Sequence, residues 1–439
     1  MEKNIFVLGL DQFNLQYLRR SARASGCAFH ALLSYDEIRG SWEYPVQDLL
    51  VRCRRRLDAF RGSIDAIIGY WDFPVTDMVP ILCKAYGLPG ASLESVLKCE
   101  HKYWSRVEQS RVIPEAVPLF EGFDPFDEDR IQKISLLYPF WIKPSRSYRS
   151  YLAFKVNDQK GLSDSLEQIR ANVGRIADPF RILLDETRIQ PEMKQKLVRN
   201  ICVAESLLSG RQCTVEGYVY NKWVYCCGIV DSVREADRSS LLSYIYPSTL
   251  PDRVQSRMRD LSRKIMEHID YDQATFNIEF FYNQTDDSIT LLEINPRCSQ
   301  SHAYLFEKVD GTSNLSAMVD LALGQEPDHP SEKGQYRCAA KYMLRSYNDG
   351  IVSRVPSRTE KDRVQSLVPD AEIKVLVKKN MRLRELDTQD SYSYELMDLF
   401  IAGVDEEDLA GKYRRCLDHL AIGLKLRFSP ATCRPQNGK

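Results

Sequence analysis

Two acidic residues near the middle of the chain have a spacing that suits a metal site. Two strand-like runs, Thr275–Tyr282 and Ile289–Asn295, are separated by a short polar loop, which predicts a β-hairpin. Side chains alternate between the faces of a strand, so Glu293 and Asn295 share one face, and a symmetric loop places Glu279 directly opposite Glu293. The Cβ atoms of the two glutamates are then about 4.5–5.5 Å apart.

A like-charge pair at that distance destabilises a sheet unless a cation lies between the carboxylates. Two carboxylates and the amide of Asn295 are hard oxygen ligands that suit Mg²⁺, which keeps waters and nucleotide phosphates in its shell. We therefore predict that Glu279, Glu293 and Asn295 bind Mg²⁺, with Mn²⁺ as an alternative ion. In a second interpretation, the two glutamates are ordinary surface acids on a solvated sheet face.

The composition points to a soluble protein with small-molecule partners. The chain has 439 residues, 44% of them hydrophobic, and a net charge of -1, so several packed units are expected and neither nucleic acid nor an anionic membrane is an expected partner. It contains no apolar run of eighteen residues, and its first residues lack a signal-peptide core, which predicts a cytoplasmic protein. The 12 cysteines form no zinc-like cluster and are expected to be reduced.

The elements that must position the hairpin alternate in type along the chain. From residue 4 to about residue 90, short apolar runs alternate with amphipathic stretches, which predicts a parallel α/β unit of Rossmann-like architecture. Its first turn, Gly9–Asn14, lacks the glycine pattern of a dinucleotide site. Further expected elements are helices at Ser92–Glu108, Gly161–Val173, Pro251–Ile269 and Glu406–Leu424, and strands at Pro139–Lys143, Tyr151–Val156, Ile201–Glu205, Thr214–Tyr220, Trp223–Asp231, Arg337–Arg345 and Glu372–Val377.

The run Glu293-Ile-Asn-Pro-Arg297, which follows a strand that contains Ile278-Glu279, resembles the metal site of the ATP-grasp ligases. Other pieces resemble the family in the same order along roughly residues 1–325. The resemblance implies that Lys102 and Lys143 contact the phosphates of ATP. It also implies that the segment from Val203 through Glu205 and Leu208 to Gly210 is the hinge beside adenine, and that Thr214-Val-Glu-Gly-Tyr is the strand that follows the hinge.

The sequence also departs from the family pattern. The glycine-rich loop expected after the strand lysine reads Ser145-Arg-Ser-Tyr-Arg-Ser150, in which Ser147 and its neighbours offer hydroxyl and guanidinium donors in place of backbone amides. The acid expected before Lys102 is His101, and the acid expected near the ribose is Gln212, whose amide is a weaker acceptor than a carboxylate. A lid that no longer closes over ATP would make the chain a nucleotide-binding pseudo-enzyme.

Two residues that follow the hairpin in the sequence, Arg297 and His302, are candidate catalytic groups. Arg297 can present its planar fork to a substrate carboxylate or to an acyl phosphate, and a structural ion pair is its alternative role. His302 titrates near neutrality and can take a proton from an attacking amine, although a lone histidine is also common as a structural residue. The segment Asp231–Tyr246, with Arg234 and Arg238, is either a substrate loop or a solvated charged face.

These observations predict an α/β and α+β multidomain protein with an ATP-grasp fold. The expected units are a Rossmann-like domain at 1–112, a lid at 113–205, an ATP-grasp core with the metal site at 206–326 and an accessory α+β domain at 327–439. The expected activity is ATP-dependent joining of a carboxylate to an amine through an acyl phosphate, with release of ADP and phosphate. Activation of bicarbonate, as in biotin carboxylases, is the alternative reaction, and a homodimer is a further expectation.

Overall fold

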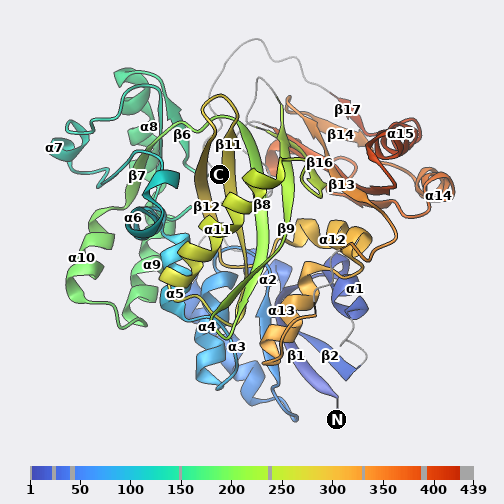
Figure 1. Cartoon of the computed structure of the whole chain (residues 1–439), viewed down its shortest axis with the longest axis horizontal. Coiled ribbons are helices and arrows are strands. Elements are labelled where there is room, and N and C mark those ends of the chain that lie inside the picture. Colours follow the sequence, from blue (N-terminus) through green and yellow to red (C-terminus); the bar gives the residue numbers. More distant parts are fainter. Residues whose placement is uncertain are drawn as a thin grey trace.

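The computed structural model of the chain describes residues 2–21, 26–39, 45–147, 151–235, 240–328, 332–386 and 393–425. The side chains of residues 176 and 178 are also left out of the description. No helix in these ranges is long and apolar enough to cross a membrane. Four sheets, of three, four, eight and two strands, make up the architecture (Figure 1).

The N-terminal unit is a three-stranded parallel sheet, as the alternating pattern predicted. Strand β1 (Lys3–Leu10) lies between β2 (Cys27–Ser34) and β3 (Ala66–Gly69). The apolar run Ile5–Leu8 is buried on both faces of the sheet, as expected for a parallel strand covered by helices. The helices of this unit are α1 (Gln12–Arg20), α2 (Tyr35–Arg39), α3 (Val46–Asp58) and α4 (Val75–Ala85).

The prediction of a single helix at Ser92–Glu108 is wrong, because the helix is interrupted at His101. The structure has two helices, α5 (Leu93–Glu100) and α6 (Lys102–Val112). His101 is extended, with φ -84° and ψ 97°, and its Nδ1 accepts a hydrogen bond of 3.2 Å from the backbone N–H of Trp104. A side chain that caps the first turn in this way begins a new helix, so Lys102 stands at the start of α6.

The unit predicted as the lid, which is called the lid unit below, is a four-stranded antiparallel sheet in the order β4-β7-β5-β6, packed against helices (Figure 1). Its strands are β4 (Phe120–Phe123), β5 (Phe140–Pro144), β6 (Phe154–Val156) and β7 (Cys202–Ser206). The strand predicted at Tyr151–Val156 is therefore shorter than expected, and β4 was not predicted. The helices of the unit are α7 (Glu128–Ile131), α8 (Gln159–Asn172), α9 (Gly174–Asp185) and α10 (Pro191–Arg199), and a short 3-10 turn, η2 (Pro114–Ala116), precedes β4.

The centre of the molecule is an eight-stranded sheet in the order β12-β11-β8-β9-β10-β13-β16-β15. Its strands are β8 (Arg211–Tyr220), β9 (Trp223–Arg234), β10 (Leu241–Tyr246), β11 (Ala274–Asn283), β12 (Ser288–Asn295), β13 (Cys338–Ser346), β15 (Glu372–Val375) and β16 (Tyr394–Gly403). Helix α11 (Asp252–His268) buries Val254, Met258 and Ile265 against β8 and β11. Helices α12 (Ala303–Asp310) and α13 (Asn314–Ala322), which follow the turn η3 (Gln300–His302), join the sheet to the core of the N-terminal unit.

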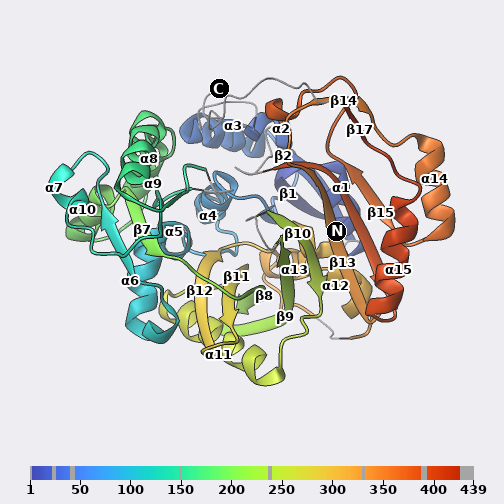
Figure 2. The same cartoon turned by 90° about the horizontal axis from the view of Figure 1, so that it is seen from above.

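The remaining elements pack at the far end of the central sheet (Figure 2). Strand β14 (Ile351–Arg354) pairs with β17 (Gly423–Lys425), and α14 (Arg358–Leu367), η4 (Leu383–Glu385) and α15 (Glu406–Leu417) complete the region. The helix predicted at Glu406–Leu424 therefore ends seven residues early. The central sheet continues across the predicted boundary at residue 326, because β10 pairs with β13, and the four domain ranges stay predictions.

Candidate active site

The two glutamates of the hairpin face each other across neighbouring strands, as predicted from their spacing. In the antiparallel pairing of β11 with β12, Glu279 is opposite Glu293 and Asn277 is opposite Asn295. A bulge between Glu279 and Phe280 shifts the register by one residue, and without this shift Glu279 would be opposite Leu292, so the bulge brings the two glutamates together. The Glu293 side chain is 38% exposed, and the pair therefore lies at the accessible rim of the sheet.

The local charges give this pair an electrostatic conflict. Burial, and after it the charge of Glu293, raise the pKa of Glu279 to about 7, while Arg234 and Arg297 act in the opposite direction. Gln212 Nε2 and Asn295 Nδ2 donate hydrogen bonds to the Glu279 carboxylate at 2.6 Å and 3.4 Å. A divalent cation would remove the conflict, since it replaces repulsion between carboxylates with attraction to both.

The donor set fits Mg²⁺ better than a transition metal. No group of three or more His, Cys, Asp or Glu side chains within the described ranges is arranged to hold a metal ion. Mg²⁺ commonly binds through one or two carboxylates and completes its shell with waters and phosphate oxygens. Asn295 presents Nδ2 to Glu279 and to Asn277, so it would ligate an ion through its other amide atom, Oδ1.

Lys102 lies beside the hairpin, although the two are far apart in sequence. Its Nζ is 3.9 Å from Glu293 Oε2 and donates a hydrogen bond of 2.7 Å to the carbonyl of Ser147. Burial lowers the pKa of Lys102, while the charge of Glu293 acts in the opposite direction. The break at His101 causes this placement, because it directs the first turn of α6 at both the hairpin and the loop after β5.

Lys143 and Glu205, predicted as phosphate and hinge residues, form a buried ion pair. Lys143 on β5 is next to β7 in the lid sheet, and its Nζ is 2.5 Å from Glu205 Oε2. Arg106 binds the other carboxylate oxygen through Nε at 2.7 Å. Burial opposes ionisation of Glu205, but Arg106 and then Lys143 outweigh it and lower the pKa to about 2. Glu205 is therefore an anion held between two cations.

The other two residues predicted near the nucleoside, Leu208 and Gln212, lie in different elements. Leu208 is partly buried in the connection between β7 and β8, three residues after Glu205. Gln212 is buried on β8 beside the hairpin, where it donates to Glu279 and accepts a hydrogen bond of 2.5 Å from Arg234 Nε. Gln212 thus contacts Glu279, which is predicted to bind the metal, and a role of Gln212 near a ribose also stays a prediction.

Arg297 connects the end of β12 to the N-terminal unit. Its Nε donates to Asp72 Oδ1 at 2.6 Å, and its Nη2 also contacts that carboxylate. Asp72 follows β3, so the ion pair lies at the carboxyl end of the parallel sheet, where α/β folds commonly bind ligands. The structural alternative for Arg297 is therefore present in the molecule, and contact with a substrate stays a prediction.

His302 belongs to a buried polar cluster. Its side chain is 1% exposed, and its Nδ1 is 2.8 Å from Glu216 Oε1. Glu216 also accepts hydrogen bonds from the backbone N–H of Ser299 at 3.2 Å and from Asn314 Nδ2 at 3.2 Å. The ring of Tyr244 lies edge-on at 4.6 Å, and His302 Nε2 has no hydrogen-bond partner within the described ranges.

Several residues of this region were missed by the sequence analysis. Asp72, Arg106 and Glu216 each hold a predicted residue through its side chain. Glu216 lay inside a quoted motif, whereas nothing in the spacing of Asp72 or Arg106 indicated their partners. The proposed substrate loop Asp231–Tyr246 consists mainly of the end of β9 and the whole of β10. Arg238, Arg149 and Ser150 lie outside the described residues.

Comparison with known proteins gives matches over part of the sequence and nearly all of the fold. Residues 224–329 match the family model "Carbamoyl-phosphate synthase L chain, ATP binding domain". The carbamoyl phosphate synthase large chain of Micrococcus luteus is 35% identical over 109 residues, which are 25% of this chain and 10% of that protein. The corresponding protein of Rubrobacter xylanophilus is 26% identical over 254 residues, which are 55% and 21% of the two chains. The chain thus spans only a small part of these relatives.

Solved structures match at full length. An L-amino acid ligase from Bacillus licheniformis has a TM-score of 0.70 at 15% identity, over 97% of this chain and 99% of that chain. A biotin carboxylase from Campylobacter jejuni, solved as a β-γ-ATP complex, has a TM-score of 0.64 at 15% identity, over 97% of this chain and 92% of that chain. The shared architecture shows that the chain has the ATP-grasp fold, and within it residues 224–329 match the model of an ATP-binding domain.

Proposed function

We propose that the protein is an ATP-dependent ligase that activates a carboxylate as an acyl phosphate and joins it to an amine. The observation that carries this proposal is the facing pair Glu279 and Glu293, whose charge conflict a divalent ion would remove, with Lys102 3.9 Å from Glu293. Carboxylate pairs of this kind bind the Mg²⁺ that accompanies nucleotide phosphates. The likeness to biotin carboxylase and L-amino acid ligase structures supports the same reaction class.

The nucleotide would lie between the lid and the central sheet. Lys102 and Lys143 come from different units and would neutralise phosphate oxygens as point charges. Glu205 and Leu208 would border adenine, and Gln212 would exchange its contact with Glu279 for one with the ribose. Mg²⁺, held by Glu279, Glu293 and Asn295, would screen the charge that builds up during phosphoryl transfer.

The chemistry of the two substrates would take place next to Arg297. Its guanidinium is held by Asp72 through one side and would orient the acid or the acyl phosphate with the remaining donors. His302 would receive the proton of the attacking amine at Nε2, because Glu216 holds the opposite ring nitrogen. The expected partners are therefore a small carboxylic acid and a small amine.

The experiment is a screen of amino acids, other small acids and amines for phosphate release from Mg²⁺·ATP. We expect release of ADP and phosphate only when an acid is present, together with hydroxamate formation when hydroxylamine replaces the amine. Release of AMP and pyrophosphate would contradict the proposal, because it would mean attack on the inner phosphate. Stimulation by bicarbonate and free biotin alone would favour the biotin-carboxylase-like alternative.

A nucleotide-binding protein without turnover is the second candidate. The observation that favours it is the loop after β5, which has no glycine and in which the carbonyl of Ser147 already binds Lys102. Calorimetric binding of Mg²⁺·ATP without phosphate release in any acid and amine pair would support this candidate. Absence of nucleotide binding would remove both.

A further inference from the structure

The loop after β5 is fixed at its first residue from two sides. The backbone N–H of Ser145 donates to the carbonyl of Ile201 at 2.7 Å, and the Ser145 hydroxyl donates to the carbonyl of Asn200 at 2.6 Å. The Ser145 carbonyl accepts a hydrogen bond of 2.7 Å from the backbone N–H of Lys102. The loop thus starts in contact with both the lid and the N-terminal end of α6.

The next residue, Arg146, turns its side chain into the N-terminal unit. It is 5% exposed, and its Nη2 is 2.5 Å from Asp77 Oδ2 on α4 and 2.9 Å from Glu100 Oε2 on α5. Its guanidinium also lies over the rings of Phe73 and Phe180, 5.0 Å and 5.3 Å from their centroids. Arg146 therefore binds groups from the N-terminal unit and from the lid helix α9 at once.

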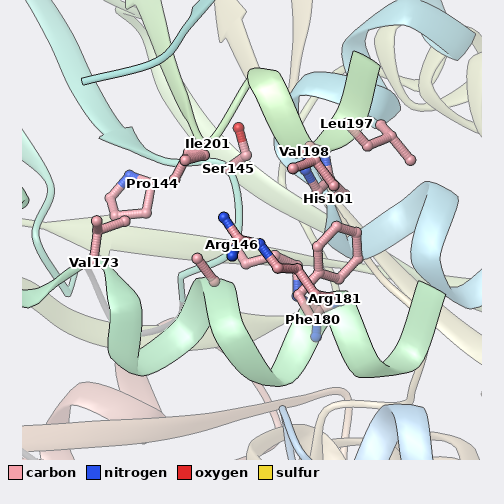
Figure 3. Close-up of a pocket in the computed structure, with 11 residues that line it drawn as sticks. His101, Pro144, Ser145, Arg146, Val173, Phe180, Arg181, Leu197, Val198 and Ile201 are labelled. Carbon is pink, nitrogen blue, oxygen red and sulfur yellow. The ribbon is translucent and has the colours of Figure 1, made fainter. Parts of the chain in front are cut away.

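The ion pairs and ring contacts of Arg146 anchor the loop after β5, and this contact set is called the anchor below. The Arg146 side chain is not closely packed on all sides. Figure 3 shows Arg146 on the wall of a pocket formed by the end of β5, helix α9 and helix α10. The residues that line the pocket are mostly apolar, and Arg146 Nη1 has no hydrogen-bond partner within the described ranges. Moving the loop would separate a buried guanidinium from the buried carboxylate of Asp77 and the partly buried carboxylate of Glu100, which is strongly unfavourable.

The anchor sets the position of the residue predicted to face the phosphates. Ser147 follows Arg146 directly, and its carbonyl accepts the hydrogen bond from Lys102 Nζ. Glycine-rich loops place backbone amides around phosphates by conformational freedom, which this segment lacks. We infer that Arg146 is a positioning residue for the nucleotide phosphates, because its ion pairs with Asp77 and Glu100 hold Ser147 and Lys102 in place. This inference rests on the proposed nucleotide site.

The test compares nucleotide binding with folding. Arg146→Met should weaken binding of Mg²⁺·ATP about tenfold or more, because a loop displaced by about 1 Å loses its phosphate contacts. Binding of adenosine should stay within about twofold of the wild type, because adenosine has no phosphates to be positioned. Arg181→Met is the matched control, since Arg181 is an exposed arginine on the rim of the same pocket, and it should leave both affinities unchanged.

A neutral triple variant separates positioning from stability. Arg146→Met combined with Asp77→Asn and Glu100→Gln leaves no unpaired buried charge, so its melting temperature should recover toward the wild-type value. Its ATP affinity should stay weak if Arg146 positions the loop. Recovery of ATP affinity together with stability would overturn the inference, and so would an equal loss of adenosine and ATP binding by Arg146→Met.

Hydrogen exchange tests the anchor without a nucleotide. In the wild type, the amides of Ser145 and Lys102, which donate to the carbonyls of Ile201 and Ser145, should be protected, and in Arg146→Met they should exchange about tenfold faster or more, because a segment released from its contacts opens locally. If the wild type fails to bind ATP, the proposed function is wrong, while protection lost in the variant still supports the anchor. Unchanged exchange in the variant would contradict the anchor itself.

Discussion

At the scale of residues, Glu205 and Glu279 show that the neighbouring charges decide whether a buried carboxyl group is ionised. Glu205 and Glu279 are the same residue type, and burial raises the pKa of both. Glu205 has Arg106 and Lys143 as ion-pair partners and stays ionised, whereas Glu279 faces Glu293 and tends toward protonation near pH 7. A divalent ion stabilises the ionised form most in a carboxyl group such as that of Glu279, which is buried beside another carboxylate.

Replacing Glu293 by Gln tests that assignment. The change keeps the shape of the side chain and removes one charge, so the metal-free protein should be equally or more stable. Stabilisation by Mg²⁺·ATP should shrink, and turnover should fall roughly 100-fold or more, because the ion loses an anionic ligand. Melting curves with and without Mg²⁺·ATP and a phosphate-release assay measure both effects, with Glu267→Gln on the exposed face of α11 as the control. A markedly less stable metal-free variant would mean that Glu293 has a structural role.

Glu100 gives a second prediction, on pH. Burial, and after it the charge of Asp77, raise the pKa of Glu100 to about 7, while Arg146 acts in the opposite direction and Asp72 adds to the increase. A carboxyl group whose pKa is higher in the folded protein stabilises it fully below pH 4.5, and this contribution is lost as pH rises through 7. The melting temperature of the wild type should therefore fall from pH 5 to pH 8.

Glu100→Gln removes the titrating group and should lessen that fall by a few degrees. Other groups that titrate in this range, Glu279 among them, are present in both proteins, so the difference between the two curves reports Glu100 together with its effect on the neighbouring Asp77. Thermal unfolding in buffers of equal ionic strength provides the measurement. Parallel curves for the two proteins would show that Glu100 does not bind a proton in this range.

At the scale of elements, Arg106 joins a helix and two sheets. From α6 it binds Glu205 on β7, and its Nη1 and Nη2 donate to the carbonyls of Leu291 and Leu292 on β12 at 3.0 Å and 2.6 Å. Strand β12 is the edge of the central sheet, so these carbonyls have no neighbouring strand beyond them. The segment predicted as the hinge and the hairpin β11–β12 thus share one buried cation.

We expect Arg106→Met to destabilise the protein by roughly 3–5 kcal/mol, because it leaves Glu205 with a single partner and two carbonyls unpaired. Arg111→Met on the same helix is the control, since the Arg111 side chain is 53% exposed and its ion pair with Glu108 should contribute less than about 1 kcal/mol. Urea unfolding followed by fluorescence measures both. Equal effects of the two substitutions would contradict the role of Arg106.

How far the sequence predicted these elements depended on the range of the interactions. The pairing of β11 with β12 could be predicted, because a short loop joins two alternating runs, but the position of Glu279 opposite Glu293 also requires the bulge after Glu279. The interruption of the helix at His101 could not be predicted, since the flanking residues favour helix on both sides and a histidine seldom caps a helix. The contacts of Glu216 with His302 and of Arg106 with Glu205 span 86 and 99 residues, and only the assembled fold brings them together.

At the scale of the whole molecule, the central sheet carries the chain from the core into its last third. Strand β13 pairs with β10, and β16 pairs with β13. Ala339, Phe400 and Ala402 belong to the same buried cluster as Ile5 and Leu8 of β1. Further contacts join the region to the N-terminal unit, since Tyr17 binds Glu372. The part of the chain after residue 326 therefore contributes to a core shared with the N-terminal unit.

This sharing predicts that a chain ending at residue 326 will not fold stably. Loss of residues 327–439 would expose the edge of β10 and the apolar surface that Ala339 and Phe400 cover. Both changes favour aggregation over folding. We expect the shortened protein to be insoluble, or to bind a hydrophobic dye and unfold without a cooperative transition. A chain ending at Lys425 keeps every described element and should unfold as the full chain does. If the shortened protein instead unfolds cooperatively at a temperature close to that of the full chain, residues 327–439 are a separate accessory domain, and the continuous sheet adds little to the stability of the rest.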